Sequence, residues 1–229
     1  MLRPGSVYHL GPVEHVFPQV TLKGSFTYTT RDQENHIELL RMLTDFDTLC
    51  ETHNLEYQIA GSTLLGALRH RGFIPWQEDA EVEILQSDVS RLKTIFPRRS
   101  RWALQATERG YMISVPGTVT PCINISLIGY SRAEQRYLLA DPERRKRYPQ
   151  YRNKYSDLHP RQRYLFENIT LWGPQQGQQL CCRRYGSSCL TVATAPSSDF
   201  KSWFSSLFKR NFRRSREDSR EHSQEKTLT

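Results

Sequence analysis

The chain has 229 residues and a formal net charge of +8, from 32 lysines and arginines against 24 acidic residues. It is long enough to bury a core, and its charge favours nucleic acid, an anionic membrane surface or a phosphorylated small molecule as partner. We find no apolar run near the roughly 18 residues of a membrane span, and no signal peptide at the start. Five cysteines without a CxxC pair argue against a structural zinc site.

The first 54 residues divide into an irregular start and one long helix. Residues 1–29 contain proline and glycine at irregular intervals, which predicts an irregular extension lying over the domain. Between residues 29 and 54, apolar side chains recur at helical spacing. Thr30 and Gln33 have the spacing of a capping box, so we expect the helix to begin near Thr30.

A strand, a turn and a short helix are expected next. The alternation in LEYQIA predicts a strand over residues 55–60, which Gly61 and Ser62 interrupt. Ser62 is a natural N-cap for a helix over residues 63–71, and Gly72 is expected to end that helix.

The segment DAEVEIL has a two-residue period that predicts a strand. Its apolar residues share one face, so Asp79, Glu81 and Glu83 must share the other. A helix capped by Ser87 and three strands are expected to follow, at residues 87–96, 101–106, 110–115 and 122–128. Helices and strands thus alternate, which predicts an α/β or α+β class with a mixed sheet.

The remainder is more polar. Residues 131–163 are basic and tyrosine-rich, which predicts a loop-rich insertion beside the site, and residues 165–174 predict a late strand. Residues 196–229 predict an amphipathic helix and a disordered basic tail. The main domain should therefore extend over residues 30–195.

Carboxylates at alternate positions of one strand project in the same direction, roughly 6 to 7 Å apart, and can bind one hard cation. A Gly-Ser turn at a helix N-terminus offers backbone N–H groups to a phosphate. Together these features predict a nucleotidyltransferase-type site, in which Mg²⁺ neutralises a pyrophosphate. The alternative is that the acids form a solvated strand face.

The stretch AGSTLLGALRHRGFIPWQEDAEV, residues 60–82, resembles the signature of the LicD family. This family includes bacterial phosphocholine transferases and the animal fukutin and fukutin-related proteins. Weaker matches, including Phe166-Glu167 and Tyr185-Gly186, extend the resemblance to roughly residues 36–190. Membership implies a polymerase-beta-like nucleotidyltransferase core. It also implies transfer of a phospho-alcohol, such as phosphocholine or ribitol phosphate, from a CDP-linked donor to a glycan.

The resemblance assigns roles by position. Asp79 and Glu81 fall where the family holds its metal, Mg²⁺ or Mn²⁺, and Arg69 and His70 match an Arg-His pair that we assign to donor phosphates. The full set of expected substrate-binding residues is Gly61, Ser62, Thr63, Arg69, His70, Trp76 and Asn124. Animal relatives act in the Golgi lumen behind an N-terminal anchor, which this chain does not show, so a membrane-associated or a cytosolic site of action stays open.

Departures from the family pattern raise an alternative. An Asp-Asp pair is replaced by Gln77-Glu78, the second metal aspartate is Glu81, and the expected third carboxylate falls on Asn124, which cannot act as a base. We hypothesise that Glu83 partly replaces the lost carboxylate and is catalytic with Asp79 and Glu81. The simpler possibility is that Glu83 is exposed.

Three further readings stay open. A degraded family member could bind a glycan or a partner without turnover. Residues 200–214 have the pattern of an interfacial helix on an anionic membrane, or of a helix docked on the domain. Arg144–Arg147 with nearby tyrosines resemble a nucleic-acid surface, although the signature belongs to the glycan-directed branch and makes nucleic acid an unlikely partner.

Overall fold

The computed structural model describes residues 1–11, 13–97 and 100–195. The helix and tail expected at 196–229, with the basic amphipathic stripe at 200–214, lie outside these residues. Within the described part, every helix is too short or too polar to cross a membrane.

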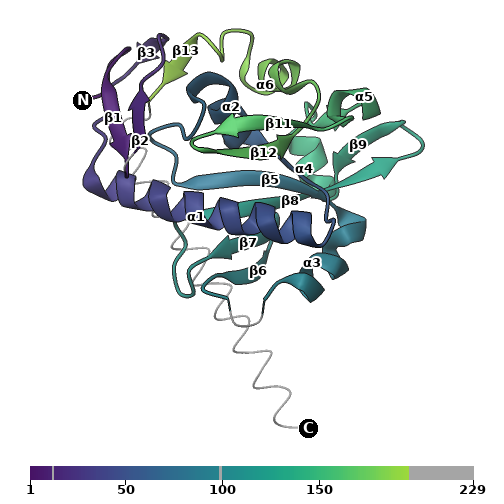
Figure 1. Ribbon diagram of the computed structural model, residues 1–229. Coiled ribbons are helices and arrows are strands. Elements are labelled where there is room, and N and C mark those ends of the chain that lie inside the picture. The colour runs from purple at the N-terminus through teal and green to yellow at the C-terminus, as the bar shows by residue number, and fades with distance from the viewer. Residues whose placement is uncertain (12, 98–99, 196–229) are drawn as a thin grey trace.

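The domain is built on a seven-stranded sheet (Figure 1). The strands run in the order β10-β9-β8-β5-β4, and β7, with β6 beside it, also pairs with β8. Their bounds are β4 Tyr57–Ile59, β5 Asp79–Leu85, β6 Ala103–Thr107, β7 Gly110–Ser114, β8 Cys122–Ser131, β9 Arg136–Leu139 and β10 Arg152–Asn153. Strands β5 and β8 are parallel whereas the other pairs are antiparallel, so the predicted mixed sheet is confirmed.

Helices cover this sheet. The long helix α1 crosses the sheet and contacts β5 and β8, while α2 lies against β5 and α6 (Figure 1). The helices are α1 Thr30–Thr52, α2 Gly61–His70, η1 Gln86–Asp88, α3 Val89–Ile95, α4 Pro142–Arg147, α5 Tyr155–Leu158 and α6 Gly177–Tyr185. Ala80, Val82 and Ile84 are buried in the same core as the apolar side of α1, as the alternation in β5 predicts.

The expectation of an irregular extension at residues 1–29 is wrong. Strands β1 (Val7–Leu10) and β2 (Val13–Val16) form an antiparallel hairpin, and β3 (Thr21–Lys23) pairs in parallel with β13 (Val192–Thr194). These strands are only three or four residues long, too short to show an alternation in sequence. A small apolar cluster joins them to the domain, with Phe17 fully buried in it.

The segment 131–163 is also more ordered than expected. It supplies β9 and β10 to the central sheet and contains α4 and α5. Each of these elements is only two to six residues long, too short to show a clear period in the sequence. The segment also contacts the central sheet through a side chain, since Arg144 of α4 hydrogen-bonds Ser126 of β8.

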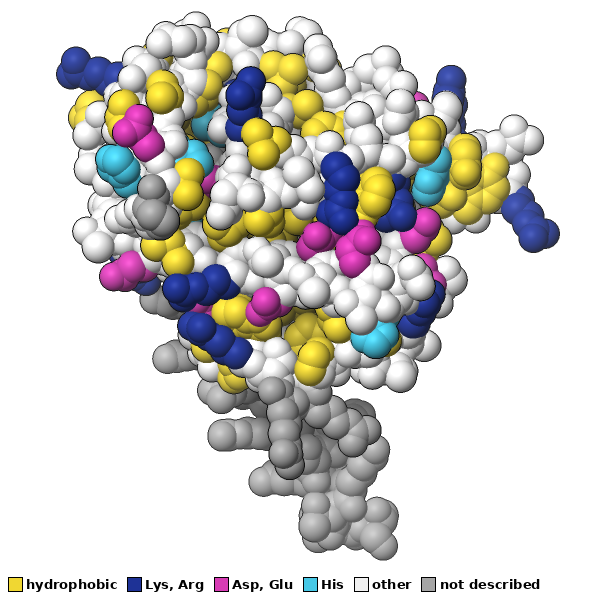
Figure 2. Space-filling view, viewed as in Figure 1, with side chains coloured by type: hydrophobic (Ala, Val, Ile, Leu, Met, Phe, Trp, Pro, Cys, Tyr) yellow, Lys and Arg dark blue, Asp and Glu magenta, His cyan; other side chains and the backbone are white. Residues whose placement is uncertain are grey.

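The late strand expected at 165–174 is a hairpin of β11 (Gln162–Phe166) and β12 (Ile169–Gly173). Figure 2 shows basic and acidic side chains close together where this hairpin lies beside α1. Arg163 binds Asp47 and Glu51 of α1, with 2.7 Å between the paired nitrogen and oxygen atoms in each case. These ion pairs fix the hairpin to the long helix.

The start of α1 corrects the expected capping box by one residue. The N-cap is Thr29, whose hydroxyl accepts from the Asp32 backbone N–H at 3.2 Å. In return, the Asp32 carboxylate accepts from the Thr29 N–H at 2.9 Å. Aspartate fills the role expected for Gln33 because its short side chain reaches back from the third helical position.

Replacing the true cap should therefore destabilise the protein more than replacing its neighbour. We expect Thr29→Ala to lower the free energy of unfolding by about 1 kcal/mol, because the Asp32 N–H loses its acceptor. Thr30→Ala, at an exposed first helical position, should have little effect. Urea unfolding of both variants measures the difference, and equal losses would contradict the assignment.

Candidate active site

Two parallel strands bring the predicted polar residues together. In the β5–β8 register, Glu81 lies opposite Asn124 and Asp79 opposite Cys122. The Asn124 amide donates to Asp79 Oδ2 at 2.8 Å. Asp79, Glu81 and Asn124 are each partly exposed, so they form one accessible polar group at the beginning of these strands.

Glu81 lies against the N-terminus of α2. Its Oε2 accepts from the Ser62 backbone N–H at 2.5 Å, and its own N–H donates to Thr63 Oγ1 at 2.7 Å. A β-carbon at Gly61, which has φ +51°, would lie 1.9 Å from that carboxylate oxygen, so glycine is required there. The Gly-Ser-Thr turn predicted to bind phosphate therefore holds a carboxylate, which the helix dipole also favours.

The helix cap at this turn differs from the prediction. Ala60 is the N-cap of α2, and the Ser62 side chain makes no capping bond. Arg71 ends the helix in the left-handed conformation, with φ +57°. The Ala60 N–H donates to the Glu81 carbonyl at 2.9 Å. Helix α2 is thus positioned by β5 instead of by its own cap.

Burial and a neighbouring acid both act on the pKa of Asp79. Burial, followed by the Glu81 carboxylate, raises the pKa of Asp79 from 3.8 to about 7. The Asn124 hydrogen bond and the positive charge of Arg109 act in the opposite direction. Two carboxylates that repel in this way offer a site whose charge a cation would relieve.

Glu83 has different partners. Its side chain is 2% exposed and the Arg184 side chain 4%, and Arg184 Nη2 donates to Glu83 Oε1 at 2.9 Å. The other oxygen, Oε2, accepts from Gln58 at 2.8 Å. The possibility that Glu83 is simply exposed is therefore wrong. Since protein donors engage both oxygens, the structure also speaks against Glu83 as the replacement catalytic carboxylate.

The guanidinium of Arg184 completes this buried pair. It lies 3.7 Å from the centroid of the Tyr151 ring, in a cation–π contact. Burial by itself lowers the pKa of Arg184, but the Glu83 carboxylate together with Tyr151 and Tyr185 outweighs burial and raises it. The pair thus connects α6 to the middle of β5, on the same face as the accessible acids and next to them along the strand.

Arg69 and His70 also differ from their expected role at the donor phosphates. Arg69 Nη1 donates to the carbonyl oxygens of Cys189 and Val192 at 2.8 and 2.9 Å, which holds the segment that leads into β13. His70 is 7% exposed, and burial lowers its pKa to about 3. A neutral ring gives a phosphate no charge, so the structure places both residues in packing roles.

Trp76 lies in a cluster of aromatic rings from the N-terminal segment. Its ring centroid is 5.8 Å from Phe26 and 6.4 Å from both Phe17 and His70. Trp76 is partly buried and contributes to packing, and its predicted role in substrate binding stays a prediction.

Glu167 contacts the backbone of the signature at Gly72 and Phe73. Its Oε1 accepts from the Phe73 N–H at 2.8 Å, and a β-carbon at Gly72 would lie 2.0 Å from that oxygen. Its Oε2 lies 2.6 Å from Nε2 of His15 in the N-terminal hairpin. The weak Phe166-Glu167 match in the sequence thus marks a contact that shapes the signature loop.

The sequence did not single out Arg109, and it marked Arg144 only as part of a basic run. Arg144 donates to Ser126 Oγ at 3.2 Å and to the Arg109 carbonyl at 2.8 Å, and Ser126 lies opposite Glu83 in the β5–β8 register. Arg109 is exposed and close enough to lower the pKa of Asp79. The basic run at 144–147 was visible in sequence, but its contact with β8 depends on the fold.

The acids fit a metal only in part. Asp79 and Glu81 each have a second carboxylate oxygen, and Asn124 has a carbonyl, which are the oxygen ligands that Mg²⁺ and Mn²⁺ take. Among the described residues, we find no group of three or more histidines, cysteines or acids arranged to bind a metal. A cation here would therefore need substrate oxygens or water to complete its shell.

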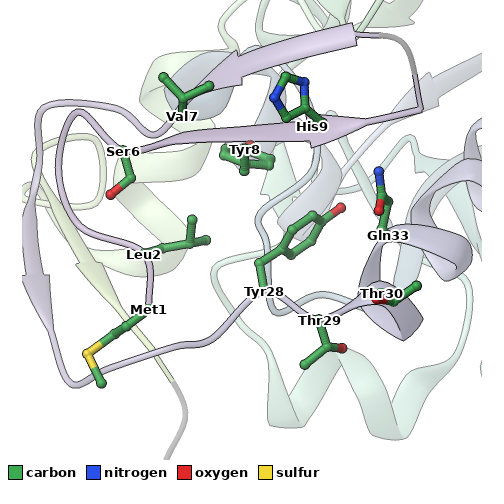
Figure 3. A pocket seen from close by; sticks show the side chains of 10 residues that line it. All are labelled: Met1, Leu2, Ser6, Val7, Tyr8, His9, Tyr28, Thr29, Thr30 and Gln33. Atoms are coloured by element: carbon green, nitrogen blue, oxygen red, sulfur yellow. The ribbon is translucent and has the colours of Figure 1, made fainter.

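A separate hollow of about 370 Å³ lies between the first strand and the beginning of α1 (Figure 3). Tyr8, His9, Tyr28 and Gln33 are among its lining residues. All its lining residues come from the first 33 positions, so it is a different place from the acidic group.

A mixed sheet flanked by helices, with two acids of a central strand beside a helix N-terminus, is a nucleotidyltransferase-like core. Residues 54–176, more than half of the chain, match the family LicD/FKTN/FKRP, nucleotidyltransferase domain. The protein belongs to this family.

Two relatives match parts of this chain, and the chain spans less than two thirds of the length of each. The chain is 26% identical over 172 residues to the uncharacterized protein RP689 of Rickettsia prowazekii, covering 74% of this chain but 62% of that protein. It is 36% identical over 64 residues to the lipopolysaccharide cholinephosphotransferase LicD of Haemophilus influenzae, covering 28% of this chain and 24% of that protein.

Among solved structures, the antibiotic-resistance factor ANT(2″)-Ia aligns with 87% of this chain and 99% of its own. The TM-score is 0.42 and the identity 11%. A likeness this low adds no weight to the family assignment.

The buried pair gives a stability prediction. Glu83→Gln and Arg184→Met should each lower the free energy of unfolding by about 3–5 kcal/mol, since each leaves an uncompensated buried charge. The double variant should lose less than the sum, and denaturant unfolding measures all three. Glu143→Gln, which breaks the exposed pair with Lys146, is the control and should have no measurable effect. Additive losses would show that the two groups do not interact.

His70 gives a pH prediction. Between pH 6.5 and about 3, the unfolded chain binds a proton at His70 that the folded protein does not, so the contribution of His70 to stability should fall as the pH is lowered. The raised pKa of Asp79 acts in the opposite direction up to about pH 7, so each variant is compared with the wild type. His70→Gln should reduce this pH dependence, whereas His9→Gln at an exposed position should preserve it. Thermal unfolding at pH 4.5 and pH 7.5 tests this. A His70→Gln variant with the wild-type pH dependence would refute a buried neutral ring.

Proposed function

We propose that this protein transfers a phospho-alcohol, of the phosphocholine or ribitol phosphate type, from a CDP-linked donor to a glycan. Membership of the LicD family supports a transferase. The matched segment of the Haemophilus cholinephosphotransferase supports a phosphocholine-type group. The observation that carries the proposal is the placement of Asp79 and Glu81 as accessible acids beside the α2 N-terminus.

The positions of the residues suggest a separate role for each. Asp79 and Glu81 would hold Mg²⁺ or Mn²⁺, with the Asn124 carbonyl as a neutral neighbour. A divalent cation bound there would supply positive charge that offsets the negative charge of the diphosphate. Arg109, which is exposed beside Asp79, would contact the diphosphate, and Arg144 positions the strand turn that carries Arg109.

The reaction forms one bond and breaks another. The acceptor hydroxyl oxygen bonds to the donor phosphorus that carries the alcohol, and the bond from that phosphorus to the bridging oxygen breaks. CMP leaves, and the hydroxyl proton is released. Positioning and charge neutralisation account for most of the catalysis in such transfers, which matches a site of paired acids and arginines.

A second candidate function is a binding module that has lost turnover. Asn124 cannot accept a proton, and its amide engages one oxygen of Asp79. Glu81 is engaged by the helix N-terminus. Such a protein would bind a glycan or a partner without transferring a group.

Calorimetric titration of CDP-choline and CDP-ribitol with Mg²⁺ or Mn²⁺ tests the first proposal. We expect binding of at least one donor that requires the metal and is lost in Asp79→Asn, since this variant removes one charge of the metal pair. Asp88→Asn, the same change outside the site in η1, should leave binding intact.

Turnover then separates the two candidates. Release of CMP from the bound donor in the presence of a glycan acceptor supports the transferase. Metal-dependent donor binding without CMP release favours the degraded site. Absence of donor binding with either metal would contradict the proposed donor class.

A further inference from the structure

A pocket of about 430 Å³ lies at the far end of β5 and β8 from the acids. Its lining residues come from the end of β5, η1 and the β8–β9 hairpin, and all are uncharged: Leu85, Gln86, Ser87, Ile128, Gly129, Tyr130 and Tyr137. Its volume is within the range of small-ligand sites. The active site shares none of these residues.

Two tyrosine rings form adjoining walls of this pocket. Tyr130 and Tyr137 are cross-strand partners in β8 and β9, with ring centroids 5.2 Å apart and ring planes at 62°. Tyr130 is 49% exposed although it is a large aromatic residue. A ligand in the corner would therefore meet two aromatic surfaces set at a steep angle.

The aromatic surface continues beyond the pocket. The Tyr137 ring lies 5.8 Å from His159, which stacks on Tyr155 at 4.6 Å, and Tyr155 is 61% exposed. In Figure 2, apolar and histidine side chains gather at the edge of the molecule where Figure 1 shows β9. Exposed rings in a row are typical of a binding surface.

Two ion pairs lie near this surface. Arg152 binds Glu134 at 2.6 Å, and Arg161 binds Glu56 at 2.9 Å. An anionic ligand such as a phosphate or a nucleic-acid backbone would find no charged group in the pocket lining. The polar groups offered there, the Gln86 amide and the Ser87 hydroxyl, both donate and accept hydrogen bonds.

We propose that this pocket binds a neutral sugar unit. The flat C–H face of a sugar ring stacks on a tyrosine ring, while the Gln86 amide and the Ser87 hydroxyl suit its hydroxyl groups. This combination of aromatic walls with a few neutral polar groups recognises an uncharged polyhydroxylated ligand better than an apolar or an anionic one.

The position of the pocket relative to the acids indicates which part of a glycan it would bind. By strand alternation, Leu85 and Tyr130 lie on the face that carries Asp79 and Asn124. Asp79 and Leu85 are six positions apart, or about 20 Å along β5. If the proposed function holds, the pocket binds a unit of the acceptor glycan remote from the reacting hydroxyl, and such remote contacts supply binding energy.

Saturation-transfer NMR tests this with named probes: the methyl glycosides of glucose, galactose, mannose and N-acetylglucosamine, with glucuronate as an anionic control. We expect at least one neutral glycoside to bind the wild-type protein. Tyr130→Ala should weaken it by about tenfold, because one stacking wall is lost. Tyr130→Phe keeps the ring and should retain binding, and Leu165→Ala, at a site with the same 49% exposure on β11, is the unrelated surface control.

Each outcome bears on the proposal. Binding by none of the four glycosides, equal binding by Tyr130→Ala, or preferred binding of glucuronate would overturn it. Asp79→Asn should retain glycoside binding, since the pocket is separate from the acids. If glycosides bind while CDP-linked donors do not, the sugar pocket stands and the proposed transferase function fails.

Discussion

The repulsion between Asp79 and Glu81 is the constraint around which this domain is arranged. Two carboxylates on one face of a central strand are unfavourable unless something of opposite sign faces them. The N-terminus of α2 partly compensates the charge of Glu81. The Asn124 amide and the positive charge of Arg109 do the same for Asp79. Burial first, and the Glu81 carboxylate second, still raise the pKa of Asp79 in spite of these partners. A divalent cation would complete this compensation, which is why the same geometry that is costly for folding suits a metal-dependent transfer.

The elements around the acids are fixed by contacts between distant parts of the chain. The buried pair of Glu83 and Arg184 joins β5 to α6 across 101 positions of sequence. Glu167 holds the signature loop through the Phe73 N–H, and Arg69 holds the segment before β13. Charged residues around the site thus divide into the partly exposed acids Asp79 and Glu81 and the buried residues Glu83, Glu167 and Arg184, which connect neighbouring elements.

The sequence predicted most of what local pattern can encode. The long helix, the alternation in β5 and the mixed sheet follow from apolar periodicity, and the signature identified the family. Partners that lie far away in sequence left no such signal: nothing in the pattern distinguishes a solvated Glu83 from one paired with Arg184. His70 and Arg69 matched a motif, but burial decides their charge and contacts, and burial depends on the fold. Strands β1 to β3 and β9 were not predicted because each is only three or four residues long, too short for an alternation to show.

The central claim is that Asp79 and Glu81 hold a divalent cation together with the donor. Electron paramagnetic resonance of Mn²⁺ measures this directly, because bound ions lose the sharp spectrum of free Mn²⁺. We predict that CDP-choline or CDP-ribitol increases Mn²⁺ binding to one site on the wild-type protein and does not do so in Asp79→Asn, whereas Asp88→Asn behaves as wild type. Equal donor-dependent Mn²⁺ binding in Asp79→Asn and wild type would contradict the account.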